Sequence, residues 1–245
     1  MLRNFISNYL RKTLNTKQRR LLRKFFVDFT YPVFRYNLNT LAQLCGTDKY
    51  GNHSYTPLYN YHFNSIKNRK LNLLEIGIGG YDNPDYGGNS LRMWKRYCHR
   101  GKIYGIDIYD KSNFEEHRIK TFQGNQNNTG FLEQVLTHIG KIDVIIDDGS
   151  HINQDVITSF QFLFPRLNPG GIYVVEDIET SYIDSYGGDS QNLNNPKTTV
   201  NFFKNLIDCV HSENIDKNML PDSLIDYNIK SMHFYDNIIF ITKLG

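Results

Sequence analysis

Two pairs of acidic residues, each at the end of a short apolar run, have residue types and spacing that suit chemistry. Asp147-Asp148 closes the run 142–146, and Glu176-Asp177 closes the run 172–175. Runs of this length that are rich in Ile and Val are typical of strands buried on both faces of a parallel sheet. Ligands bind outside the carboxyl ends of such strands, so the sequence predicts that these carboxylates line a site.

Carboxylates that converge in this way favour a hard, oxygen-preferring cation such as magnesium. Neighbouring strands lie about 4.8 Å apart, so residues just past their ends can share one ion. His151 follows Asp148 by three positions and is a candidate general base. In the competing interpretation, Asp148 and Ser150 only cap the next helix and His151 is a structural histidine.

Strands and helices alternate along the rest of the chain, which predicts an α/β fold with a mostly parallel sheet. Apolar runs predict strands over residues 71–76, 102–108, 119–122, 142–146 and 172–175, and a closing antiparallel hairpin of residues 229–234 and 238–242. Periodicity predicts helices over residues 40–44, 59–66, 91–98, 131–139, 153–164 and 198–211. We expect Ser90 to cap the third of these helices, residues 168–171 to form a turn, and residues 180–197 to form a loop or lid over the strand ends.

A glycine-rich segment, residues 75–80, follows the first strand and lets the backbone approach a ligand closely. Asp107 ends the next strand, where an acid is placed to accept hydrogen bonds from ribose hydroxyls. A dinucleotide site would need a third glycine where Asp82 stands, and an inserted loop separates the segment from the next helix. A ligand with a ribose but no phosphate fits better, and S-adenosylmethionine is one. The alternative is a tight turn with a surface Asp.

These motifs resemble known families. The segment 75–79, Asp107 and the closing hairpin resemble class I S-adenosylmethionine-dependent methyltransferases. More narrowly, residues 147–151, the turn 169–171 and residues 176–178 resemble the metal-dependent sugar O-methyltransferases of macrolide and related pathways, and their cephalosporin-cluster relatives. The resemblance covers roughly residues 40–245 and implies a Rossmann-like, seven-stranded, mostly parallel sheet with a C-terminal antiparallel hairpin.

The resemblance also implies roles for individual residues. It implies that Asp148, Glu176 and Asp177 hold Mg²⁺ and that His151 is the catalytic base, with Asp148 acting beside it. The cofactor site that we predict consists of Glu75, Gly77, Gly79, Ser90, Asp107, Asn125, Gln126 and Asp147. The family often has an acid where Asn125 stands, which leaves the adenine contacts open. Asp147 points away from Asp148 by alternation, so it either helps the cofactor pocket or caps a turn.

The predicted reaction is the transfer of a methyl group from S-adenosylmethionine to a sugar hydroxyl of a glycosylated natural product or a polysaccharide. Lys49, His53, Tyr55 and Tyr182 are predicted to shape the acceptor site, although His53 and Lys49 are as readily plain surface residues. Catechol-type methylation of an aromatic diol and a non-catalytic binding protein of the same fold are the alternatives. The chain has no Asn-Pro-Pro-Tyr-like motif, which argues against methylation of nucleic acid.

Composition divides the chain in two. Residues 1–35 are predicted to form a basic amphipathic arm of one helix or a helix pair, with eight Lys or Arg and one Asp in the first 30 residues. The arm is either a docking or oligomerisation segment, giving a homo-oligomer, or a peripheral contact with an anionic membrane or an acidic partner. Residues 36–245 are predicted to form the methyltransferase domain. The absence of a membrane-spanning run and three widely separated cysteines, Cys45, Cys98 and Cys209, predict a cytoplasmic enzyme.

Overall fold

The computed structural model describes residues 13–15, 18, 19, 21, 22, 25, 37–211, 215 and 227–245. Apart from those isolated positions, the arm predicted over residues 1–35 lies outside the described residues. None of the described helices combines the length and the apolar character that crossing a bilayer requires.

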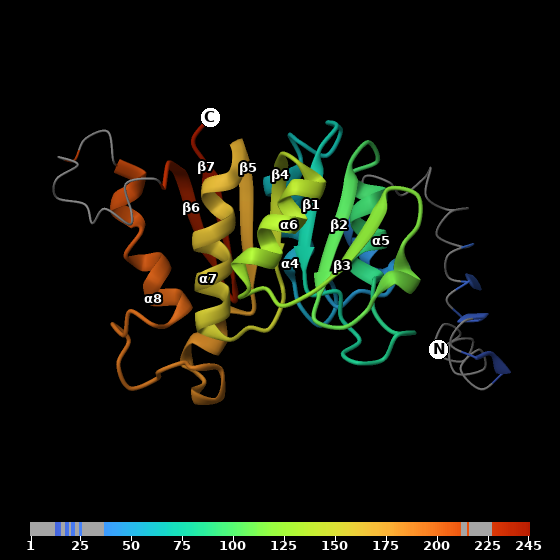
Figure 1. The fold of residues 1–245 in the computed structure, drawn as a ribbon, viewed down its shortest axis with the longest axis horizontal. Helices are drawn as coiled ribbons and strands as arrows, with labels where there is room; N and C mark the ends of the chain where they lie inside the picture. The colour runs from blue at the N-terminus through green and yellow to red at the C-terminus, as the bar shows by residue number, and fades with distance from the viewer. Residues whose placement is uncertain are drawn as a thin grey trace.

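Seven strands form one sheet in the order β3-β2-β1-β4-β5-β7-β6 (Figure 1). The strands are β1 (Asn72–Ile76), β2 (Lys102–Asp107), β3 (Ile119–Gln123), β4 (Ile142–Asp147), β5 (Leu167–Glu176), β6 (Ile229–Tyr235) and β7 (Ile238–Lys243). Strands β1 to β5 pair in parallel, and β7 is antiparallel to both β5 and β6. The sheet confirms the predicted class, a mostly parallel seven-stranded sheet with a C-terminal antiparallel hairpin.

Helices cover both faces of the sheet (Figure 1). One face packs against α3 (Leu38–Cys45), α4 (Tyr55–Phe63) and α5 (Asn89–Tyr97), and the other packs against α6 (Thr129–Ile139), α7 (Asn153–Leu163) and α8 (Thr199–Lys204). Successive strand residues point to opposite faces, so each buried strand contributes to both cores. In β4, Val144 and Ile146 belong to the core on the α3–α5 side, whereas Ile145 belongs to the core on the α6–α8 side.

The strand order reverses beside β1, which pairs with β2 on one side and with β4 on the other. The connections leaving β1 and β4 therefore part in opposite directions at the carboxyl edge of the sheet. Such a switch point opens a crevice where doubly wound sheets bind their ligands. The predicted glycine-rich segment and the first predicted acidic pair both lie at this point.

The structure corrects several predicted boundaries. Residues 168–171 do not form a separate turn, because Leu167 already pairs with Ile142 and the intervening residues are absorbed as an irregularity within β5. The helix predicted over residues 59–66 is α4 and ends at Phe63. The helix predicted over residues 198–211 is divided into α8 and the 3-10 helix η5 (Ile207–His211). The N–H of Asn205 is shared between two carbonyls, which tightens the last turn of α8.

The prediction that Ser90 caps a helix is wrong. Helix α5 begins at Asn89, and its N-cap is Gly88, which has a φ of 66° and no side chain to donate or accept a hydrogen bond. Ser90 is inside the first turn, and its hydroxyl donates to Glu75 instead. The inserted loop between β1 and α5 brings the chain into the helix in a left-handed conformation, for which glycine is the favoured residue.

Candidate functional site

Strand register brings the predicted acidic residues together at the carboxyl edge. Ile76 pairs with Asp147 across β1 and β4, and Asp147 pairs with Val175 across β4 and β5. Asp148 and Glu176 come next on adjacent strands. Alternation then directs Asp147 toward the α6–α8 side of the sheet and Asp148 with Glu176 toward the α3–α5 side.

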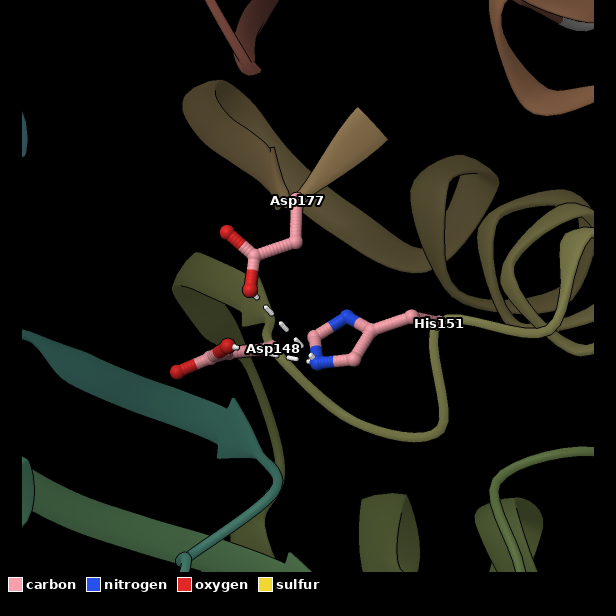
Figure 2. A group of neighbouring side chains, drawn as sticks. All are labelled: Asp148, His151 and Asp177. Atoms are coloured by element: carbon pink, nitrogen blue, oxygen red, sulfur yellow. Dashed lines mark ion pairs between the residues drawn. The ribbon is translucent and has the colours of Figure 1, made fainter. Parts of the chain in front are cut away.

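Asp148, His151 and Asp177 form a cluster whose ligand atoms all lie within 4.8 Å of one another. Figure 2 shows the imidazole of His151 pointing toward both carboxylates. The Nε2 atom lies 3.9 Å from Oδ1 of Asp148 and 3.7 Å from Oδ2 of Asp177. These separations are too long for direct hydrogen bonds, so they leave the imidazole able to contact a ligand placed between the carboxylates.

Two residues of this cluster have an unusual backbone conformation. His151 has a φ of 56° and Asp177 has a φ of 54°, both in the left-handed region. A residue other than glycine in that region costs on the order of 1 kcal/mol, and such residues concentrate at functional sites. Both residues lie in the segments that follow β4 and β5 at the carboxyl edge of the sheet.

Lys49 enters the site from the turn between α3 and α4, and its side chain is 1% exposed. Its ammonium nitrogen lies 2.7 Å from Oδ2 of Asp148, 2.7 Å from Oε1 of Glu176 and 3.4 Å from Oε1 of Glu75. Burial lowers the pKa of Lys49, but the carboxylates of Asp148, Glu176 and Glu75 outweigh it and raise the pKa well above its usual value. The prediction that Lys49 shapes the acceptor site has no support in this geometry, because the ammonium is occupied by carboxylates.

Glu176 is buried and accepts hydrogen bonds at Oε1 from Lys49 and from the hydroxyl of Tyr59. Burial and the neighbouring Asp148 raise the pKa of Glu176, while Lys49 and Tyr59 act in the opposite direction. Among the described residues, the group of ligand atoms that can share a metal contains Asp148, His151 and Asp177, and Glu176 is outside it. The role of Glu176 as a ligand stays a prediction.

Tyr55 and Asn237 brace Asp177. The hydroxyl of Tyr55 donates to Oδ1 of Asp177 at 2.6 Å, and the ring stacks on His53 at 4.8 Å. Asn237, in the turn of the hairpin, accepts from the N–H of Glu179 at 2.8 Å and so fastens the segment after β5. Tyr55 and His53 are both predicted acceptor-site residues; Tyr55 contacts Asp177 directly, and His53 packs against the ring of Tyr55. Tyr182, predicted for the same site, is 45% exposed on the 3-10 helix η3 (Ile178–Tyr182).

Sequence reasoning missed Tyr59 and Asn237. Tyr59 lies on the buried face of α4 among Phe63, Trp94 and Phe240, and its ring looks like an ordinary core residue in the sequence. Only its hydroxyl reaches the site, where it donates to Glu176. The sequence did contain a signal for Tyr59: a tyrosine on the buried face of a helix usually needs a hydrogen-bond partner for its hydroxyl, which indicates a polar group nearby.

At the predicted cofactor end, Glu75 is fully buried. It accepts from the hydroxyl of Ser90 at 2.7 Å and from the indole of Trp94 at 3.1 Å. Burial raises the pKa of Glu75, and Lys49 partly offsets the effect. Asp107 accepts from the backbone N–H groups of Ile78 and Tyr109, at 3.0 and 2.9 Å. A carboxylate can accept about four hydrogen bonds, so Asp107 retains capacity for a ribose.

The two predicted glycines differ in their surroundings. A Cβ atom on Gly77 would lie 1.9 Å from the backbone oxygen of Asp148, whereas one on Gly79 would meet nothing within 4 Å. Gly77 is therefore required by the close contact between the ends of β1 and β4. Gly79 faces open space, as a residue beside a ligand would.

Asp147, Gln126 and Asn125, all predicted to contact the cofactor, are arranged differently from one another. Asp147 is buried on the α6–α8 side and accepts hydrogen bonds from Ser159, Gln126 and Tyr173. Burial raises the pKa of Asp147 to about 6, against the effect of the Ser159 and Gln126 hydrogen bonds. Gln126 also accepts from the N–H of Ser150, whereas Asn125 is exposed. Asp147 thus connects Ser159 of α7 to Gln126, and Gln126 in turn holds the backbone of Ser150 in the loop after β4.

Comparison with known proteins supplies independent evidence. Residues 85–178 match a family described as a methyltransferase domain. The chain is 45% identical over 209 residues to demethylmacrocin O-methyltransferase of Streptomyces fradiae, covering 84% of this chain and 53% of that protein. It is 46% identical over 204 residues to 8-demethyl-8-alpha-L-rhamnosyl tetracenomycin-C 2'-O-methyltransferase of Streptomyces olivaceus, covering 83% of this chain and 53% of that protein.

A solved structure is similar as well. The MycE methyltransferase of the mycinamycin pathway, solved in complex with Mg, SAH and mycinamycin VI, aligns with a TM-score of 0.78 and 42% sequence identity. The alignment covers 85% of this chain and 55% of that one. This chain spans about half the length of the curated relatives it matches.

Proposed function

Because the chain belongs to the class I S-adenosylmethionine-dependent methyltransferases, we propose that it catalyses magnesium-dependent methylation of a sugar hydroxyl. The methyl donor is S-adenosylmethionine, and the acceptor is a glycosylated natural product or a polysaccharide. The observation that carries the proposal is the cluster of Asp148, His151 and Asp177 at the switch point of the sheet. The O-methyltransferases of macrolide and tetracenomycin pathways that resemble the chain support the choice of acceptor.

The residues present fit a magnesium ion. Asp148 and Asp177 offer carboxylate oxygens, the donors that magnesium prefers. Lys49 occupies Oδ2 of Asp148, which leaves Oδ1 directed toward His151 and the cluster. We assign Asp148 and Asp177 as ligands, retain Glu176 as the predicted third, and assign His151 as base, since an imidazole is a poorer donor for this ion than an oxygen.

When bound, the ion lowers the pKa of the acceptor hydroxyl and the cofactor supplies an electrophilic methyl group. The protein then contributes positioning and proton transfer. Nε2 of His151 would accept the proton of the acceptor hydroxyl as the oxygen bonds to the methyl carbon, while the bond from that carbon to the sulfonium sulfur breaks and its electron pair leaves with S-adenosylhomocysteine. Tyr55 holds Asp177 in place by donating to it. We assign Glu75, Gly79 and Asp107 to the binding of the cofactor.

The cellular setting and the domain boundary are further parts of the proposal. We place the enzyme in the cytoplasm, supported by three buried cysteines, Cys45, Cys98 and Cys209, none of which is in a disulfide. Residues 36–245 form the methyltransferase domain, and the arm over residues 1–35 mediates self-association or a peripheral contact.

The test uses the purified full chain. Calorimetry should detect micromolar binding of S-adenosylhomocysteine and none of NAD. Methyl transfer from labelled S-adenosylmethionine to a panel of glycosylated macrolides and aromatic polyketides should require Mg²⁺ and stop with EDTA. The absence of S-adenosylhomocysteine binding would overturn the methyltransferase assignment, and turnover that survives EDTA would overturn the role of the metal.

A further inference from the structure

The buried ammonium group of Lys49 contacts three carboxylates, each at or just past the end of a different strand. The Nζ atom of Lys49 contacts Glu75 at the end of β1, Asp148 after β4 and Glu176 at the end of β5. The side chain of Lys49 is 1% exposed, and those of Glu75 and Glu176 are 0% and 3% exposed. A buried carboxylate either takes up a proton or needs a counterion nearby, and the ammonium of Lys49 lies within 3.4 Å of all three carboxylates.

Among the described residues, the other hydrogen-bond donors to Glu75 and Glu176 carry no charge. Glu75 accepts from the neutral groups of Ser90 and Trp94, and Glu176 accepts from the neutral hydroxyl of Tyr59. Both Oδ2 of Asp148 and Oε1 of Glu176 lie 2.7 Å from the same nitrogen, so a single cation at that point contacts both. Lys49 therefore occupies a cation position between the predicted cofactor carboxylate and the predicted metal carboxylates.

We infer that Lys49 is a positioning residue that acts as an internal cation, preassembling the carboxylates of Glu75, Asp148 and Glu176. By holding Oδ2 of Asp148, it directs the other oxygen of that carboxylate toward His151 and Asp177. The inference rests on the proposed function for the identity of the site, but it concerns charge balance in the protein alone. Without the lysine, the carboxylates need a cation from solution.

The test is thermal unfolding of the full chain in EDTA and in Mg²⁺, for the wild type and Lys49→Met. The substitution removes the charge and keeps much of the buried side-chain volume. We expect a lower unfolding temperature in EDTA and a rise on adding Mg²⁺ that exceeds the wild-type rise. An equal rise in the two proteins would show that Lys49 only fills space, and would overturn the inference.

Lys111 offers a matched control. It is also 1% exposed, but its ammonium donates to the backbone carbonyls of Tyr81, Asn83 and Tyr86, not to carboxylates. Lys111→Met should lower the unfolding temperature and leave the Mg²⁺-dependent rise at its wild-type size. An enlarged rise in this variant as well would assign the effect to general destabilisation and contradict the inference.

A double variant keeps the test decisive if Lys49→Met does not fold. Lys49→Met with Glu176→Gln removes one negative charge together with the positive charge. We expect this protein to be more stable in EDTA than Lys49→Met. A double variant no more stable than the single one would overturn the inference. None of these measurements needs turnover, so failure to methylate sugars would refute the proposed function and leave the inference standing.

Discussion

At the scale of single residues, His151 lies between two carboxylates without a direct hydrogen bond to either. Nε2 is 3.7 Å from Asp177 and 3.9 Å from Asp148. A base in this position can receive a proton from a hydroxyl that is bound to a metal ion held by the same two carboxylates. The left-handed backbone at His151 sets the direction of the ring, so substitutions at this position have to respect that conformation.

His151→Asn is the sharpest substitution, because asparagine adopts the left-handed conformation readily but does not act as a base near neutral pH. We expect kcat to fall by about 10²-fold or more, the usual contribution of a general base. Calorimetry of S-adenosylhomocysteine serves as the control and should give an unchanged affinity. Wild-type turnover in this variant would remove His151 from the mechanism.

His62 makes a separate, pH-dependent contribution to the stability of the protein. Its ring stacks on Phe240 at 4.1 Å, and Nε2 lies 3.1 Å from the hydroxyl of Tyr235. Burial and the nearby His233 lower the pKa of His62 to about 4. The unfolded chain binds a proton below about pH 6.5, while the folded protein does so only near pH 4. Stability is thus fully present above pH 6.5 and falls as the pH drops toward 4.

The expected result is that His62→Phe loses less stability between pH 7.5 and pH 5 than the wild type does. Phenylalanine keeps the stacking on Phe240 and has no group to protonate. Unfolding temperatures at the two pH values measure the difference, and His117→Gln, at an exposed position, is the control. If His62→Phe loses as much stability as the wild type between these pH values, the pKa of His62 in the folded protein is not lowered.

At the scale of elements, the contact between the ends of β1 and β4 fixes how closely the glycine-rich segment lies to Asp148. Gly77 donates its N–H to Ile106 of β2, and Asp148 donates its N–H to Ile76 of β1. These bonds continue the sheet just past the strands and bring the backbone of Asp148 against Gly77. Backbone geometry therefore holds Asp148, the proposed metal ligand, beside the glycine-rich segment proposed to bind the cofactor.

Substitution of the two glycines separates packing from backbone strain. Both have positive φ, 89° at Gly77 and 76° at Gly79, but only at Gly77 would an added Cβ atom clash, 1.9 Å from the backbone oxygen of Asp148. We expect Gly77→Ala to cost at least about 2 kcal/mol more in the free energy of unfolding than Gly79→Ala. Denaturant unfolding of the ligand-free variants checks this. Equal losses would show that the strand ends can separate without cost.

At the scale of the whole molecule, the α3–α4 region lies outside the sheet but supplies residues to the site at its carboxyl edge. Lys49, Tyr55 and Tyr59 come from this region, and each contacts a carboxylate at the end of β4 or β5. The aromatic packing of Tyr59 against Trp94 and Phe240 anchors α4 on the sheet. Loss of this packing would therefore disturb the site as well as the core.

The site residues named above begin with Lys49, so the domain proposed over residues 36–245 contains all of them. Deleting residues 1–35 should leave methyl transfer within a fewfold of the full chain and change the oligomeric state or the subcellular distribution. Size-exclusion chromatography with light scattering, run beside the activity assay, measures both effects. A folded truncation without activity would place the domain boundary too late in the chain.

The sequence by itself determined the alternation of strands and helices, the acidic pairs at the ends of β4 and β5, and the position of His151 after Asp148. These features are local, because strand periodicity and turn residues act over a few positions. Tertiary structure decided which groups surround the carboxylates. Lys49 meets Asp148 across 99 positions and Glu176 across 127, and Tyr59 meets Glu176 across 117. No local pattern specifies such contacts, since they form only when α4 packs on the sheet and buries the ammonium and hydroxyl groups beside the strand ends.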